Sequence, residues 1–85
     1  MTILDNTLLT REAAAAALTA AGFPTSRATL AIKASRGGGP AYRKFGYKPL
    51  YRWGDLIHWA ESRLGPPVVS TAELDALRRG LHAAR

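Results

Sequence analysis

Residues 25–52 read TSRATLAIKASRGGGPAYRKFGYKPLYR, and this stretch decides the fold of the chain. Its first part, from Thr25 to about Ser35, has the polar start and the spaced apolar residues of a short helix. The sequence from Gly37 to Pro40 then interrupts this pattern, because glycine and proline both disfavour a continuing helix. A helix of about ten residues is therefore predicted, with a sharp end.

A β-hairpin is predicted immediately after this helix. Residues 41–45 and 50–53 are short strand-like runs, and the turn residues 46–49 (GYKP) separate them. Successive side chains on a strand point to opposite faces, so Tyr42 and Lys44 share one face of the hairpin. The chain is thus expected to be mainly α with a small β-hairpin.

The positive charge of the chain is concentrated in the same stretch. The whole chain carries 12 Lys and Arg against 6 Asp and Glu, a net charge of +6. Residues 25–52 contain seven of these bases and no acid, and the remainder is net negative. Such a concentration indicates a surface for a polyanion, and a helix beside a hairpin suits nucleic acid. A membrane-surface role would need one basic helix with a bulky apolar face, which this pattern lacks.

A preceding helix completes a two-helix unit. Residues 8–12 are predicted as its start, with Thr10 as the N-cap, and Gly22 is predicted as its C-terminal stop. Thr25 or Ser26 then caps the second helix. Two helices joined by a four-residue turn that contains glycine describe a helix-turn-helix, whose second helix enters the major groove of DNA.

Two further helices are predicted downstream. Residues 56–64 have a broad apolar side, and Trp59 is interpreted there as a core anchor rather than a stacking platform. After a Gly-Pro-Pro break, Ser70 and Glu73 form a capping box for a last amphipathic helix. Its narrow apolar stripe is expected to fold back onto the domain or, as the alternative, to pack against a neighbouring copy, which makes it a candidate for self-association. The stripe consists of Leu74, Leu77 and Leu81.

The expected domain organisation follows from these elements. Residues 1–7 are predicted to be a flexible lead-in, 8–64 a DNA-binding domain, and 65–85 a Pro-containing linker with the last helix. Without cysteine there is no disulfide, thiolate metal site or cysteine nucleophile. No catalytic triad, carboxylate pair or phosphate loop is discernible, so no enzyme activity, metal or cofactor is expected. No signal peptide or membrane span is recognised, and a cytoplasmic, nucleoid-associated bacterial protein is expected.

The pattern of residues over 8–64 resembles the MerR-like (AlpA-like) winged helix-turn-helix of small excisionases, which are also called recombination directionality factors. The matching residues are Leu9-Thr10-Arg11-Glu12-Ala13-Ala14, Thr29-Leu30, Gly38-Gly39-Pro40, Tyr42, Lys44-Phe45-Gly46, Tyr51-Arg52 and Asp55-Leu56-x-x-Trp59. The resemblance implies a winged helix-turn-helix over residues 8–64, and the last helix predicted above is added to it.

The resemblance also implies a function. It indicates an architectural protein that binds and bends double-stranded DNA at an attachment site, with copies of itself on adjacent sites. The bent DNA would direct a partner tyrosine recombinase (integrase) towards excision of a mobile element. A small transcription regulator of a phage or integrative element is the alternative, and a non-catalytic protein-interaction module is a second one.

The predicted DNA contacts fall into two groups. Ser26, Arg27 and Thr29 at the start of the second helix are candidates for base edges, because Arg can bind guanine in a bidentate fork. The remaining bases are more suited to phosphate contacts, which position a protein without specifying a sequence. The recognition-helix candidates are Ser26, Arg27, Thr29, Lys33 and Arg36, and the wing candidates are Arg43, Lys44, Tyr47, Lys48 and Arg52.

Overall fold

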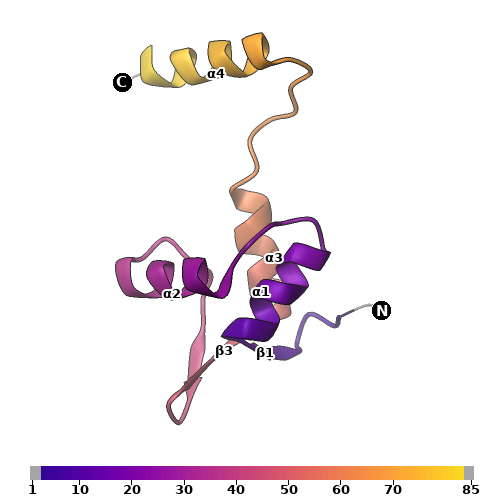
Figure 1. The fold of residues 1–85 in the computed structure, drawn as a ribbon, viewed down its shortest axis with the longest axis vertical. Coiled ribbons are helices and arrows are strands. Elements are labelled where there is room, and N and C mark those ends of the chain that lie inside the picture. Colours follow the sequence, from indigo (N-terminus) through magenta and orange to yellow (C-terminus); the bar gives the residue numbers. More distant parts are fainter. Residues whose placement is uncertain (1–2, 84–85) are drawn as a thin grey trace.

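The computed structural model describes residues 3–83, with side chains to residue 78, and contains four helices and one three-stranded antiparallel sheet (Figure 1). This is a helix-rich fold with a small hairpin, as predicted. No helix within residues 3–83 combines the length and apolar character needed to cross a membrane. The elements are β1 (Leu8–Thr10), α1 (Arg11–Ala20), α2 (Arg27–Arg36), β2 (Arg43–Phe45), β3 (Lys48–Arg52), α3 (Trp53–Ser62) and α4 (Thr71–Ala83).

Both ends of α1 lie where the sequence predicts them. Thr10 is the N-cap, and its side-chain oxygen accepts a hydrogen bond from the Ala13 amide at 3.2 Å. At the other end the Phe23 amide donates to the Leu18 carbonyl at 2.8 Å, and Gly22 between them has φ +103°. This is the arrangement of a Schellman motif, in which the left-handed residue turns the chain away from the helix.

The connection between α1 and α2 runs over residues 21–26 and is held by one hydroxyl. The Thr19 hydroxyl donates to the Thr25 carbonyl at 3.1 Å and accepts from the Thr25 amide at 3.2 Å. Ser26 then caps α2, because its side-chain oxygen accepts from the Thr29 amide at 3.0 Å. The connection is two residues longer than the predicted turn, since one cap residue on each side lies outside the helices.

The sheet has the strand order β1-β3-β2, and both outer strands run antiparallel to β3. The hairpin is confirmed, but its turn is the two residues Gly46-Tyr47, because Phe45 pairs with Lys48. Lys48 and Pro49 therefore belong to β3 and not to the turn. Pro49 has no amide hydrogen to donate, and it lies where β3 extends past the end of β1, so it costs the sheet no bond to β1.

The strand β1 corrects the sequence-based prediction, which took residues 8–12 as the start of a helix. In the structure the helix begins at Arg11, and the three residues before it pair with β3, from Leu8 opposite Arg52 to Thr10 opposite Leu50. A partner more than 40 positions away leaves no local signal in the sequence. The apolar residues before the Thr10 cap were therefore predicted as the approach to the helix and not as a strand.

Residues before β1 also contact the domain. The Thr7 carbonyl accepts from the Trp53 amide at 3.0 Å, and the Asp5 carbonyl accepts from the Gly54 amide at 3.0 Å. These bonds satisfy two amides of the first turn of α3, which have no partner within that helix. The prediction of a flexible lead-in over residues 1–7 did not include these contacts.

The core lies between α1, α2, α3 and one face of β3. Its largest fully buried side chains are Leu18 from α1, Leu30 from α2, Tyr51 from β3 and Leu56 from α3. Each such side chain stabilises the fold by about 1.5–3 kcal/mol through burial. The helices α1, α2 and α3 and the base of the hairpin are therefore fixed relative to one another by one shared cluster of buried side chains.

Trp59 lies on the core side of α3, as predicted. Its ring is half-buried against the core cluster, and its indole N–H donates to the Gly38 carbonyl at 2.9 Å. The Arg63 guanidinium lies 5.5 Å from the ring centroid. The indole bond joins α3 to the loop that follows α2, so it helps to set where the hairpin begins.

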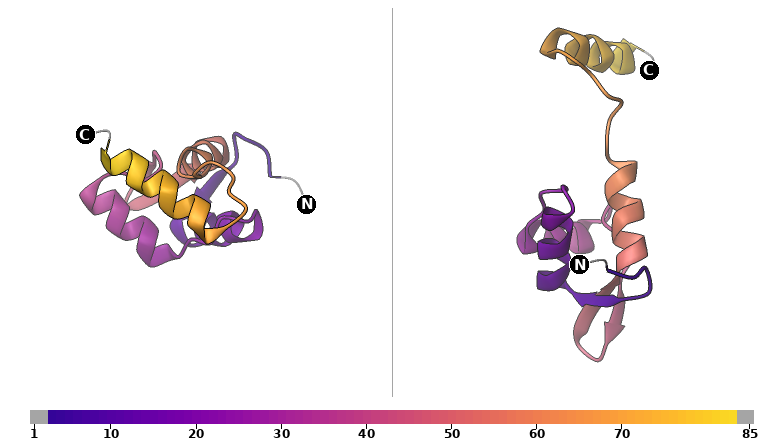
Figure 2. Two further views of the ribbon diagram at one scale, coloured as in Figure 1. Left: turned by 90° about the horizontal axis from the view of Figure 1, so that it is seen from above. Right: turned by 90° about the vertical axis from the view of Figure 1, so that its right-hand side faces the viewer.

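The helix α4 stands apart from the compact part of the molecule, at the end opposite the hairpin (Figures 1 and 2). One half of its predicted capping box is present, because the Glu73 amide donates to the Ser70 hydroxyl at 3.2 Å. The Glu73 carboxylate accepts at 3.1 Å from the Val69 amide, one residue before the cap. Within residues 3–83, α4 forms no packed interface with the sheet or with α1 to α3. The structure therefore does not have the fold-back arrangement.

Candidate nucleic-acid interface

Three cationic side chains from three elements meet around one hollow of about 260 Å³. We call it the cationic hollow. Arg11 comes from the start of α1, Arg27 from the start of α2, and Lys48 from the start of β3. Glu12 is the only carboxylate among its lining residues, which are Thr10, Arg11, Glu12, Arg27, Lys48 and Pro49. The fold thus brings bases that are distant in sequence to one concave surface, which concentrates positive potential there.

The first turn of α2 determines which of its side chains can reach outwards. The Ser26 hydroxyl accepts from the Thr29 amide and lies 2.9 Å from the Thr29 hydroxyl. Both predicted base-contact hydroxyls are therefore engaged with each other and with the cap, and Thr29 is half-buried. Arg27 is exposed and lines the cationic hollow. Among the three predicted base contacts, Arg27 has the geometry that best suits this role.

Arg11 was not among the predicted site residues. Its Nε donates to the Tyr51 hydroxyl at 3.0 Å, and its guanidinium carbon lies 5.9 Å from the ring centroids of both Tyr42 and Tyr51. These contacts hold the guanidinium beside the cationic hollow. One signal in the sequence could have identified it: a base in the first turn of a helix is unfavourable beside the positive end of the dipole, which suggests another role.

Lys33 and Arg36 lie at the other end of α2. Arg36 is nine residues beyond Arg27, which corresponds to about 14 Å along a helix. It is exposed, whereas Lys33 is half-buried. The loop after α2 covers part of Lys33, because a Cβ built on Gly39 would lie 2.9 Å from the Lys33 Cβ. Both bases also suit the negative end of the helix dipole, so they have a structural role independent of any ligand.

The predicted wing residues divide between the two faces of the hairpin. Tyr42 contacts Tyr51 at a centroid distance of 5.7 Å on the core-side face, and Lys44 follows it by two positions on that face. Arg43 instead lies opposite Leu50 on the outer face. Tyr47 at the turn is 97% exposed. The hairpin therefore does not present all its bases on one surface.

Arg52 has internal partners in the structure. Its Nε and Nη2 donate to the Asn6 side-chain oxygen at 3.2 and 2.9 Å, and its Nη1 lies 3.4 Å from an Asp55 carboxylate oxygen. The guanidinium thus joins the N-terminal segment to α3. This arrangement favours a structural role over the predicted phosphate contact.

The candidate self-association residues lie on α4. Leu74 is half-buried and Leu77 is 39% exposed. The side chain of Leu81, the third member, lies outside the described residues. No group of three His, Asp or Glu that could hold a metal ion occurs in the described part of the chain.

Comparison with known proteins finds no matching family model, no matching curated protein and no matching solved structure. The function is therefore inferred from the residues of this chain and their geometry.

Proposed function

We propose that this protein is a sequence-specific, double-stranded-DNA-binding architectural protein with a winged helix-turn-helix. In this proposal α2 is the recognition helix and the β2–β3 hairpin is the wing. The capped connection between α1 and α2 and the hairpin after α2 support this assignment, because their order is that of the motif. The acid-free stretch of seven bases supports a polyanionic ligand.

The observation that carries the proposal is the cationic hollow. Arg11, Arg27 and Lys48 come from three separate elements and line one surface depression. A core of buried side chains holds those elements, so the backbone positions that carry the three cationic side chains keep their spacing before any ligand binds. Cationic side chains spaced in this way favour a rigid, regularly charged ligand such as a duplex.

Within this surface the side chains have different proposed roles. Arg27 would bind base edges in the major groove, where a bidentate contact to guanine gives about 1–3 kcal/mol of discrimination. Tyr47 and the hairpin bases Lys44 and Lys48 would contact the backbone or the minor groove. The proposed phosphate contacts are Arg11, Lys33, Arg36, Lys44 and Lys48. Five such contacts imply that log K falls against log salt concentration with a slope of roughly −4 to −5.

The proposed biological role rests on the resemblance to excisionases. In that role several copies bind adjacent sites, bend the attachment-site DNA and direct a tyrosine recombinase towards excision. A single 9.1 kDa module offers a modest footprint, so tight specific binding is expected to need several copies. Transcription control by the same surface is the alternative role.

Two experiments test this proposal, one for sequence-specific DNA binding and one for the biological role. Selection of bound sequences from a random duplex library should return one consensus site, and failure to enrich any sequence would contradict specific binding. An excision assay with a recombinase and attachment sites from the same element then separates the two roles. Stimulated excision supports the architectural role, whereas altered promoter activity without excision supports a regulator.

A further inference from the structure

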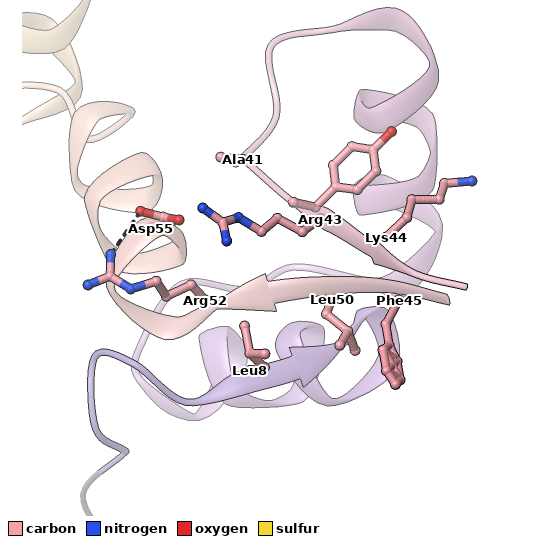
Figure 3. Close-up of a pocket in the computed structure, with 9 residues that line it drawn as sticks. Leu8, Ala41, Arg43, Lys44, Phe45, Leu50, Arg52 and Asp55 are labelled. Carbon is pink, nitrogen blue, oxygen red and sulfur yellow. Dashed lines mark hydrogen bonds and ion pairs between the residues drawn. The ribbon is translucent and has the colours of Figure 1, made fainter. Parts of the chain in front are cut away.

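The outer face of the sheet has a second hollow, of about 700 Å³, with an apolar side (Figure 3). We call it the outer hollow. Phe45 is 71% exposed, Leu8 is 55% exposed and Leu50 is half-buried. Figure 3 shows these three side chains pointing to the same side of the sheet. Large exposed apolar side chains that gather on one surface commonly mark a contact site for another protein.

The charge beside the outer hollow is positive. Figure 3 shows Arg43 extending towards the Arg52–Asp55 ion pair, while Lys44 points away from it. Asp55 is the only acid that lines the hollow. Because Asp55 already forms an ion pair with Arg52, no lining carboxylate is left to pair with Arg43. An acidic and apolar segment would therefore complement this surface.

The first part of α4 is such a segment. Leu74 and Leu77 lie one helical turn apart, and residues 71–77 also contain Glu73 and Asp75, with the first base of the helix at Arg78. The helix has only 13 residues, and a helix of that length is marginal in water without a partner surface. Within residues 3–83, no other element packs extensively against it.

We propose that α4 of one copy docks in the outer hollow of a second copy. Leu74 and Leu77 pack against Phe45 and Leu8, and Asp75 lies near Arg43. Helix and hollow are different surfaces of the same chain, so each copy offers one of each to its neighbours. Such a contact is heterologous, and repeated between successive copies it builds a head-to-tail chain. Two copies that exchange their helices would instead close into a symmetric dimer, whose size does not grow with concentration. A wild-type chain that stops at a dimer would therefore contradict the head-to-tail arrangement.

This association leaves the cationic hollow free, although Lys44, one of the proposed phosphate contacts, lines the outer hollow. The outer hollow and the cationic hollow share no lining residue. A copy can therefore present the cationic hollow to a ligand while its outer hollow is filled. Arg43 was predicted as a wing contact to DNA, and in this proposal it contacts the helix α4 of the neighbouring copy instead. Association between copies can be measured without DNA.

Complementation between two variants of the full chain tests the head-to-tail arrangement. Leu77→Asp removes an apolar contact from the docking face of α4 and leaves the outer hollow intact. Phe45→Asp removes an apolar contact from the outer hollow and leaves α4 intact. In sedimentation, the wild-type chain should form species that grow with concentration, and each variant alone should stay monomeric. An equimolar mixture should form a heterodimer and nothing larger. Because Phe45 and Leu77 are both partly exposed, the variants should keep the circular dichroism spectrum of the wild type.

A matched control tests the choice of hollow. Leu64 is 64% exposed and lines a separate hollow beside Phe23 and Trp59. Leu64→Asp should associate like the wild type. If it abolishes association instead, the helix docks beside Phe23 and the proposal is wrong. The proposal is equally wrong if the mixture remains monomeric or if the wild-type chain is monomeric at every concentration.

Cysteine pairs provide a second measurement for weak association, because the chain contains no cysteine. Phe45→Cys mixed with Leu77→Cys should form a disulfide-linked heterodimer under mild oxidation. Leu64→Cys mixed with Leu77→Cys should give at least tenfold less of it. Equal yields would mean random collision and would overturn the proposed contact.

Discussion

Arg27 is the side chain on which sequence preference is expected to depend. It is exposed at the first position of α2, while Ser26 and Thr29 beside it are engaged in the cap. Arg27→Ala should reduce discrimination between the selected site and random DNA by about 1–3 kcal/mol. Arg36→Ala is the matched control at the far end of the helix, and it should weaken binding to both duplexes equally. Equal losses for Arg27→Ala on both duplexes would assign it to phosphate binding.

Tyr51 positions Arg11 and can be tested without disturbing the core. Tyr51 is 1% exposed, and its hydroxyl accepts from the Arg11 Nε. Tyr51→Phe keeps the ring, so the free energy of unfolding should fall by only about 0.5–1.5 kcal/mol. The affinity for duplex DNA should fall severalfold, because the guanidinium loses its orientation beside the cationic hollow.

The control for this variant is Tyr42→Phe. Tyr42 stacks near the same guanidinium but has no hydrogen bond through its hydroxyl among the described residues. The stability of the Tyr42→Phe protein, measured by urea unfolding, and its DNA affinity, measured by fluorescence anisotropy, should match those of the wild type. A Tyr51→Phe protein that binds DNA normally would show that Arg11 does not contribute to the interface.

At the scale of elements, the local signals in the sequence were sufficient for the ends of α1 and the starts of α2 and α4. The start of α3 was predicted wrongly: the helix begins at Trp53 instead of residue 56, and the Thr7 and Asp5 carbonyls accept its first amides in place of a side-chain cap. The Thr10, Ser26 and Ser70 caps and the stop at Gly22 all use residues within a few positions of the helix end. The strand β1 depends instead on a partner in β3, and a three-residue strand has no period long enough to detect. The turn length of the hairpin was overestimated because Lys48-Pro49 resembles turn chemistry while it lies in β3.

The loop between α2 and the hairpin should be sensitive to added volume at one position. A Cβ on Gly39 would lie 2.9 Å from the Lys33 Cβ and 3.5 Å from the Lys33 carbonyl carbon, so the backbone must shift. Gly39→Ala should lower the free energy of unfolding by about 1–3 kcal/mol. Gly65→Ala is the control, since a Cβ there meets nothing within 4 Å, and it should be neutral. Similar stability of both variants would mean that the loop is not packed against α2.

The helix α4 should be dispensable for folding. It has no packed interface with the rest of the described chain, so truncation after Gly65 should change the free energy of unfolding by less than about 0.5 kcal/mol. Cooperative binding to adjacent sites should weaken, because the segment proposed to join the copies is lost. Urea unfolding and titration of a two-site duplex measure the two effects. A truncated chain that unfolds would place the helix in the core.

At the scale of the whole molecule, the sequence predicted the charge concentration but not how the fold divides it. Arg27 and Lys48 were predicted, and they meet in the cationic hollow. Arg11 was missed because its place beside them depends on Tyr51, a contact 40 positions away. Arg43 and Arg52 were assigned to DNA because they are bases in a hairpin. The strand register places Arg43 on the outer face, and contacts with Asn6 and Asp55 hold Arg52. Both are tertiary features, which the local sequence does not indicate.

Salt dependence of binding to a single-site duplex is the sharpest test of the proposed DNA-binding surface. The wild-type affinity should fall with a slope of roughly −4 to −5 in log K against log salt, and Lys48→Ala should flatten it by about one unit. Arg63→Ala is the control, because Arg63 lies over Trp59 beside a different hollow and should leave the slope unchanged. Binding that is indifferent to salt, or equal slopes for Lys48→Ala and the wild type, would contradict the proposed DNA-binding surface.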